Sequence, residues 1–478
     1  MKNILIFFVI VVPLIFTSCT EDIADLNIDP KAATIVEPDV LFSYGLENLA
    51  RQMADADYNN NLDRFWANYL TQTTYIQECN YDPKNRDVGG ALFDNVYGTV
   101  LIELKSAKEL VEAEEVTAEL QGAKNNQLAM ITILETYSYQ YLLDNFGNIP
   151  YSEALDIDNI TPAYDDAATV YSTIANNLST ALASMDMSSE GFDASADLLY
   201  GGDMNAWYTF GNSLMLKIGM RLSDVNSTLA SQLVSQAFTN GVFTSNDDNA
   251  AFVFLTSDPY TNPCYDYFYT QGRASDFIAS DFFINLLNTY NDPRIAYYFE
   301  DNIATYTGGP YGAVGNAYDN FSHVNPSILV ADYPGILMDY PAVAFYLAEA
   351  VERGFITGTA EDYYIDGITA SFEFWGLSAG DLATYLAETN VAYNSSNYKE
   401  SIGIQKYIAS YNQGHEGWTE ARRLDYPVLV AAGQSGTPNP KRLLYPTDEP
   451  LINGASYDAA ATAIGGDELD TPLFWDVY

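Results

Sequence analysis

The sequence predicts an all-α, mainly helical fold with long irregular loops. Helix-spaced apolar residues recur in separate segments, and 48% of the 478 residues are hydrophobic, enough for a large core. A stretch rich in Gly, Pro, Asn and Tyr interrupts this pattern. Helix pairs of this size can stack as tetratricopeptide-like hairpins, although the Trp, Gly and Tyr consensus of that repeat is not visible. We therefore expect a helical frame at about 37–240 and 336–433, a loop-rich insertion at about 241–335, and an irregular tail at 434–478.

Three segments carry the clearest helical pattern. In the first, apolar residues recur at spacings of three and four from Leu128 to Tyr141, and the pattern stops at Gly147. The second begins at Trp207, and the third begins at Asp339 and ends at Gly354. Weaker helical patterns cover 37–56, 60–78, 92–114, 165–185, 227–239, 360–374, 378–389 and 415–432.

The first residues have the layout of a signal peptide with a lipid attachment site. One basic residue, Lys2, precedes an apolar run that ends at Phe16, and Cys19 follows two small polar residues. The run is shorter than the roughly 20 residues of a membrane-spanning helix. We expect cleavage after residue 18, lipidation of Cys19, and a tether at 19–36. The acidic pair Glu21 and Asp22 resembles an export tag for the cell surface.

The charge of the chain excludes one class of ligand. The sequence has 64 acidic against 20 basic residues, a net charge of -44. Such a surface repels nucleic acid and other strong anions, so neutral or cationic ligands are favoured. Beyond Cys19 only Cys79 and Cys264 remain, and the sequence leaves open whether they form a disulfide.

No catalytic, cofactor or metal motif stands out. The sequence lacks H-E-x-x-H, G-x-S-x-G, a phosphate-binding G-x-x-x-x-G-K-[ST] and an EF-hand loop. Its two histidines, His323 and His415, fit surface or capping positions better than a catalytic pair. With so many acidic residues, neighbouring carboxylates are unavoidable and do not indicate a glycosidase. The sequence therefore predicts no enzyme, no cofactor and no metal site.

Clusters of aromatic and polar residues predict a binding site instead. Tyr offers a flat apolar face with a polar edge, which suits sugar rings and extended peptides. Trp66 is spaced with Tyr69 as on one helix face and also fits the core, and Arg273 also fits an ion-paired support. Tyr311 and Tyr318 lie in the Gly-rich insertion, where core packing explains a Tyr less well. The expected ligand-binding residues are Trp66, Tyr75, Asn80, Tyr81, Tyr265, Tyr267, Arg273, Tyr311, Asn316 and Tyr318.

Several stretches together resemble the SusD/RagB family of nutrient-binding lipoproteins, in particular its SusD-like branch. The residues that carry the resemblance follow the family's order along most of the chain, with Ala342 where the family favours Glu. They are the segment from Thr136 to Tyr151, Asn291-Asp292-Pro293-Arg294, Ala348-Glu349-Ala350 with Arg353-Gly354, Trp418-Thr419-Glu420-Ala421-Arg422-Arg423, and the tail from Tyr445 to Asp476.

The resemblance implies both a fold and a role. It implies four tetratricopeptide-like hairpins, a ligand face made of loops, a lipid-anchored position on the outer membrane, and no catalysis. It also implies a partner, a SusC-like TonB-dependent transporter that receives the captured nutrient. Oligosaccharide suits the Tyr-rich loops, and peptide is the alternative ligand. A secreted glycan-active enzyme and a helical adhesion scaffold are the alternatives outside this role.

Overall fold

The computed structural model describes residues 36–433, 435–436 and 438–477, so Cys19 lies outside the described residues. The described residues from Pro38 onward form one compact unit. Within the described residues, no helix is long and apolar enough to cross a membrane.

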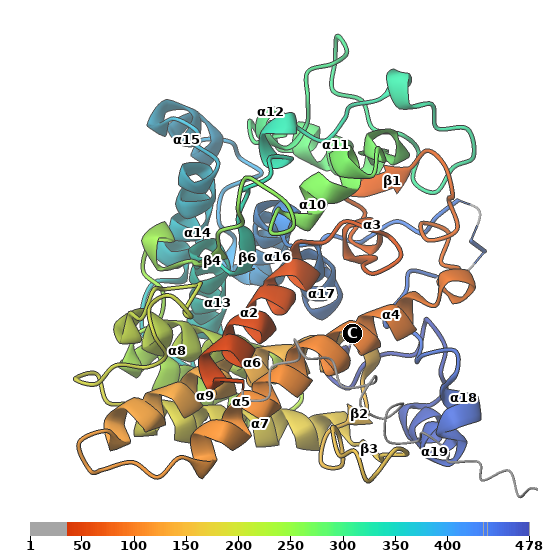
Figure 1. Ribbon diagram of the computed structural model, residues 1–478. Coiled ribbons are helices and arrows are strands. Elements are labelled where there is room, and N and C mark those ends of the chain that lie inside the picture. Colours follow the sequence, from red (N-terminus) through yellow and green to blue (C-terminus); the bar gives the residue numbers. More distant parts are fainter. Residues whose placement is uncertain (1–35, 434, 437, 478) are drawn as a thin grey trace, which may run out of the picture. The chain divides into compact units, whose positions relative to one another are not determined.

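Four helix pairs build the frame (Figure 1). Each pair consists of two helices that pack against each other and bury one apolar face, which confirms the mainly helical prediction. The pairs are α2 (Pro38–Ala54) with α5 (Ile102–Ala113), α6 (Gln121–Phe146) with α7 (Ala167–Ser184), α8 (Met204–Arg221) with α9 (Ser227–Asn240), and α13 (Tyr340–Glu352) with α14 (Ala360–Phe374). A further pair, α16 (Tyr398–Ala409) and α17 (Gly414–Leu424), packs beside them.

The expected ends of the strongest helices are confirmed. Helix α6 stops at Gly147, which has φ of 82°, a conformation that glycine adopts readily. Helix α13 begins after Asp339, whose carboxylate accepts a hydrogen bond of 3.0 Å from the backbone N–H of Ala342. That N-cap gives the helix start a polar contact even though residue 342 is Ala.

One predicted helix, at 60–78, was wrong. Helix α3 covers only Asp63–Trp66, because Asn68 takes a positive φ of 57° and turns the chain. Strand β1 (Leu70–Gln72) follows and pairs antiparallel with β5 (Phe277–Ala279). A strand pair formed by two distant segments leaves no helical or hairpin pattern in the local sequence.

The insertion and the tail hold more regular structure than predicted. In the insertion, α11 (Asp281–Thr289) starts at Ser280, whose hydroxyl accepts from the N–H of Phe283. The helix expected to reach residue 432 ends at Leu424, where Asp425 takes φ of 61°. Further short elements are α4 (Val88–Asn95), α10 (Pro263–Tyr265), α12 (Ile295–Tyr298), α15 (Ala379–Leu386), α18 (Glu449–Ile452), α19 (Gly454–Ile464), and the strands β2 (Ile149–Pro150), β3 (Tyr164–Asp165), β4 (Ala250–Phe252) and β6 (Gly335–Met338).

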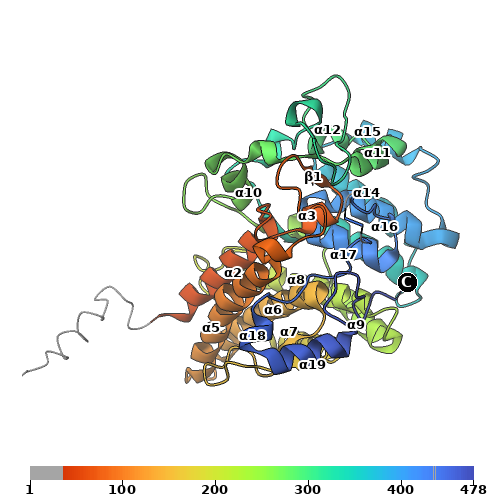
Figure 2. The same cartoon turned by 90° about the vertical axis from the view of Figure 1, so that its right-hand side faces the viewer.

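Figure 2 shows where these additions lie on the frame. Helices α10, α11 and α12 of the insertion lie together with α3 and β1, whereas α19 packs against β3. Strand β1 thus pairs with the insertion, although the chain places it inside the predicted frame, whereas α3 packs on α17.

A network of buried charges ties the frame helices together. Arg221 on α8 pairs with Asp144 on α6 and with Glu420 on α17. Arg423 on α17 pairs with Glu420 and with Glu349 on α13. These side chains are almost fully buried, so each charge depends on its partners to offset the loss of water. The network therefore fixes how four helices meet.

Arg294 forms a second buried centre. Its guanidinium binds Asp292 at 2.6 Å and donates to the hydroxyl of Ser371 and the side chain of Gln405. This places the Asn-Asp-Pro-Arg element of the sequence inside the fold. Arg294 joins α14 and α16 to the loop before α12.

Candidate ligand-binding face

The β1–β5 pair brings two of the predicted aromatic clusters together. The strands align Thr71 with Ile278, and the pairing continues through a hydrogen bond of 2.9 Å from the N–H of Thr73 to the carbonyl oxygen of Asp276. The loop after β1 carries Tyr75, and the loop before β5 carries Arg273. Residues from two distant parts of the chain therefore meet at one edge.

Two tyrosines and two arginines form a layered cluster at this edge. The guanidinium carbons of Arg86 and Arg273 lie 5.4 and 5.3 Å from the centre of the Tyr75 ring. The same two groups lie 4.7 and 5.9 Å from the ring of the buried Tyr58. Cation–π attraction of this kind holds a ring in place. Because Tyr75 is 50% exposed, we call this cluster the Tyr75 platform.

Buried carboxylates fix both arginines of the platform. Arg86 is paired with Glu78, and Arg273 with Asp276, and both carboxylates are shielded from solvent. Tyr75 itself takes a positive φ of 50°, a backbone conformation that a tyrosine rarely adopts. The ring is thus held from below while part of its surface faces solvent. A ring that is already ordered loses little conformational entropy when a ligand stacks on it.

A polar hollow of about 280 Å³ lies beside the segment that carries Tyr58. Its walls offer carboxylates, amides and hydroxyls, the groups that form hydrogen bonds with sugar hydroxyls. Burial, the largest cause, raises the pKa of Asp55 in this wall to about 6. The lining residues are Asn48, Arg51, Gln52, Asp55, Asp57, Asn60, Asn95, Thr99, Pro263, Asp266 and Gln271.

A second aromatic group comes from the insertion. The rings of Tyr318 and His323 stack with centres 3.6 Å apart and planes 10° apart. The rings of Tyr265 and Tyr269 lie 5.6 Å apart, and Tyr269 is exposed. The charge of Glu300 raises the pKa of both Tyr269 and Tyr318, after burial as the larger cause, so these rings share one neighbourhood.

Five of the expected ligand-binding residues are buried in this structure, which assigns them to packing. The indole N–H of Trp66 donates to the carbonyl oxygen of Glu78, and the ring packs on Trp418. Tyr267 stacks on Phe277 with centres 5.4 Å apart. Neither ring offers a face to a ligand in this conformation.

The other three buried residues, Tyr81, Tyr311 and Asn316, are held in the interior by hydrogen bonds. The hydroxyl of Tyr311 donates to the carbonyl oxygen of Phe65 at 2.8 Å, and its ring lies near Tyr81. Tyr81 donates to the side chain of Asn439, and Asn316 donates to the carbonyl oxygen of Pro310. The residues still reached by solvent are Tyr75, Asn80, Tyr265, Arg273 and Tyr318, and for these ligand binding stays a prediction.

Sequence reasoning missed Tyr58 and Arg86. Tyr58 lies in the run Asp57-Tyr58-Asn59-Asn60-Asn61, whose dense polar composition was a usable sign of a polar wall. Arg86 had no such sign, because its contact with Tyr75 depends on how the loop between them folds back.

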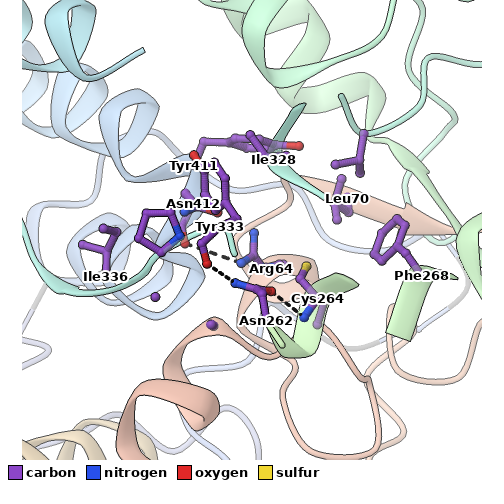
Figure 3. A pocket seen from close by; sticks show the side chains of 15 residues that line it. Arg64, Leu70, Asn262, Cys264, Phe268, Ile328, Tyr333, Ile336, Tyr411 and Asn412 are labelled. Atoms are coloured by element: carbon purple, nitrogen blue, oxygen red, sulfur yellow. Dashed lines mark hydrogen bonds between the residues drawn. The ribbon is translucent and has the colours of Figure 1, made fainter. Parts of the chain in front are cut away.

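A narrow pocket lies where the insertion meets the frame (Figure 3). Asn262 donates to the carbonyl oxygen of Tyr333 at 2.8 Å and accepts from the N–H of Cys264 at 2.7 Å. Only about 20 Å³ is open to a water-sized sphere, which suits a single water.

Cys264 and Cys79 are both free and buried, so the open question of their pairing is settled in favour of free thiols.

Comparison with known proteins places the chain in a family. The SusD-like profile, described as starch-binding associating with outer membrane, matches residues 30–446. A search of curated protein sequences finds no significant match. Within the described residues, no group of three His, Cys, Asp or Glu side chains is placed to hold a metal ion.

Solved structures agree with this assignment. A SusD homologue from Bacteroides ovatus has a TM-score of 0.78 at 26% identity, covering 93% of this chain and 100% of that one. A chitin-binding SusD homologue from Flavobacterium johnsoniae has a TM-score of 0.78 at 25% identity, covering 92% and 98%. A SusD-like protein from Bacteroidetes has a TM-score of 0.81 at 24% identity, covering 93% and 100%, and supports the fold.

The chain belongs to the SusD-like family. The family is described by starch binding and by association with the outer membrane, and its members are binding proteins without catalytic activity. The alternative of a glycan-cleaving enzyme is therefore set aside.

Proposed function

We propose that the protein is anchored at the cell surface through lipid on Cys19, captures an oligosaccharide, and delivers it to a SusC-like TonB-dependent transporter. The observation that carries the proposal is the Tyr75 platform, together with a polar hollow whose wall includes Asp57, the chain neighbour of Tyr58 in the platform. A half-exposed, pre-ordered ring can stack on a sugar, while the neighbouring amides and carboxylates bind its hydroxyls. The absence of strong positive charge suits a neutral glycan.

The ligand class is tested by calorimetry with the purified protein. The panel contains chitin oligosaccharides, because a relative at 25% identity binds chitin, and starch oligosaccharides, because the family is described by starch. It also contains a basic peptide, since the acidic surface would attract one. We expect one glycan to bind with measurable heat. Binding of the peptide with no glycan bound would favour the peptide alternative.

The site is tested with Tyr75→Ala. Loss of one stacking ring is expected to weaken glycan binding about tenfold, which corresponds to about 1.4 kcal/mol. The matched control is Tyr44→Ala on α2, where a tyrosine is exposed to a similar extent, 48%, outside the platform. Equal affinity of both variants for the glycan would remove the platform from the binding site.

The anchor is tested with Cys19→Ala in the full-length precursor. The lipid on Cys19 is the expected attachment, because Cys19 follows the apolar run that ends at Phe16 and two small polar residues. We expect the variant to move from the membrane fraction to the soluble fraction. Retention in washed membranes would contradict lipidation at this position.

A further inference from the structure

Four aliphatic side chains are exposed on two segments that contact each other. Ile157 and Ile160, in the loop between β2 and β3, are 91% and 84% exposed. Leu451 and Ile452, at the end of α18, are 88% and 59% exposed. We call these four residues the aliphatic surface. Single exposed apolar residues are common, but a group of large aliphatic side chains marks a surface that another molecule covers.

The two segments of the aliphatic surface are held to each other. The side chain of Asn453, next to Ile452, donates to the carbonyl oxygen of Pro162 at 2.9 Å. The ring of Tyr164 in β3 packs on Tyr445, with centres 5.0 Å apart, just before α18. The exposed residues therefore come from one built surface.

The loop that carries Ile157 and Ile160 is also tied internally. The carboxylate of Glu153 accepts from the side chain of Asn159 at 3.0 Å and from the N–H of Ala163 at 2.9 Å. These contacts hold the loop across both isoleucines. Their exposure is thus a property of an ordered loop, in which neither side chain is turned toward the core.

Carboxylates lie close together beside the same surface, since Asp448 and Glu449 precede Leu451 and Ile452 in the chain and interact with Asp94 of α4. Burial, as the largest cause, and the charges of Asp448 and Asp87 raise the pKa of Asp94 on α4. Burial and the charges of Asp448 and Asp94 also raise the pKa of Glu449 on α18. A lysine or arginine supplied by another molecule would relieve this repulsion.

We propose that the aliphatic surface and the adjoining carboxylates form the docking surface for the transporter, which presents apolar residues flanked by lysine or arginine. This inference rests on the proposed function, since it names the surface through which the transporter is bound. Burial of four aliphatic side chains supplies attraction, and the carboxylates select a partner of opposite charge.

Two other occupants fit the surface less well. In a symmetric dimer the same patch meets itself, so the carboxylates around Asp448 would face their own copies. A lipid surface carries anionic groups, which a protein with a net charge of -44 repels. A protein surface that is both basic and apolar would pair with the carboxylates and cover the aliphatic surface.

The test is recovery of the transporter with tagged full-length protein from solubilised outer membranes of the native bacterium. The docking variant combines Ile157→Ser with Leu451→Ser. The matched control combines Val314→Ser with Val428→Ser, which are 71% and 75% exposed elsewhere. We expect wild type and control to recover a TonB-dependent barrel, and the docking variant to recover at least tenfold less. All three proteins should bind the glycan equally and melt at similar temperatures.

The outcomes separate the inference from the proposed function. If the docking variant recovers as much barrel as the control, the inference is overturned while the proposed transporter stands. If wild type recovers no barrel, the proposed transporter partner is contradicted, and the inference that depends on it fails as well. Sedimentation of the purified proteins covers self-association, and a wild-type dimer that the docking variant loses would also overturn the inference. A charge reversal, Asp448→Lys, should likewise reduce recovery of the barrel.

Discussion

The guanidinium of Arg273 lies 5.3 Å from the centre of the Tyr75 ring, although one residue belongs to the predicted insertion and the other to the predicted frame. The contact exists because β1 and β5 pair and bring the two loops to one edge. Arg273 is also bound to Asp276, so its position does not depend on Tyr75. We therefore treat Arg273 as a positioning residue for the Tyr75 ring.

This role predicts that substitutions at the two positions are not additive. Arg273→Gln should weaken glycan binding about fivefold, and the double variant with Tyr75→Ala should bind no more weakly than Tyr75→Ala alone. Arg273→Lys keeps a cation beside the ring and should recover most of the affinity. Calorimetry on wild type, the two single variants Arg273→Gln and Tyr75→Ala, and their double variant measures this double-mutant cycle. Additive losses would mean that Arg273 contacts the ligand independently of Tyr75.

Tyr311 and Tyr318 should respond differently to truncation. Tyr311 is buried and hydrogen-bonded to Phe65, so Tyr311→Ala should lower the free energy of unfolding by about 3–5 kcal/mol. Tyr318 is only half-buried, so Tyr318→Ala should cost about 1 kcal/mol or less and should weaken glycan binding. Urea unfolding and calorimetry distinguish the two effects. Undiminished binding by Tyr318→Ala would remove the insertion's second aromatic group from the site.

The buried charge network should be sensitive to loss of one partner. Glu420→Gln leaves Arg221 and Arg423 with less negative charge in the core, and we expect a loss of about 3–5 kcal/mol in the free energy of unfolding. The control, Glu109→Gln, removes an exposed pair with Lys105 and should change stability by less than about 1 kcal/mol. Similar small losses in both would show that the network adds little to stability.

Asp339 should contribute a measurable pH dependence. Burial, as the largest cause, raises its pKa to about 6, whereas an unfolded Asp titrates near 4. The folded state therefore holds the proton more tightly, and the stability that Asp339 contributes is present below about pH 4 and lost as the pH rises through about 6. In Asp339→Asn this loss disappears while the N-cap to Ala342 can remain.

Urea unfolding at several pH values measures this difference. The free energy of unfolding of Asp339→Asn, relative to wild type, should rise between about pH 4 and pH 6. A constant difference across this interval would mean that the carboxyl of Asp339 keeps an ordinary pKa in the folded protein.

The long frame helices could be predicted because their cause is local. The periodicity around Leu134 and the glycine at position 147 define α6 without reference to the rest of the chain. Helix α3 and strand β1 could not be predicted in this way. They depend on the turn at Asn68 and on pairing with a strand in the insertion.

Only some of the residues expected to bind ligand are exposed in the structure, and Tyr311 shows the reason. The Gly-rich sequence suggested an open loop with exposed tyrosines. A Cβ at Gly308 would lie only 2.2 Å from the carbonyl oxygen of Ser280, so glycine there lets the loop pack tightly against its neighbour. The loop continues inward and buries the Tyr311 ring. Tyr75 and Arg273 were named, but their contact with each other depends on the tertiary fold.

The β1–β5 pair has a consequence for engineering new specificities in such proteins. The insertion alone carries Arg273 and Tyr318, whereas Tyr75 and Arg86 come from the segment after β1. A chimera that exchanges only the insertion between two relatives would combine halves of two different candidate sites. If this site sets the sugar preference, transferring that preference would require exchanging both the insertion and the segment after β1. Both strands of the β1–β5 pair would then come from the same donor.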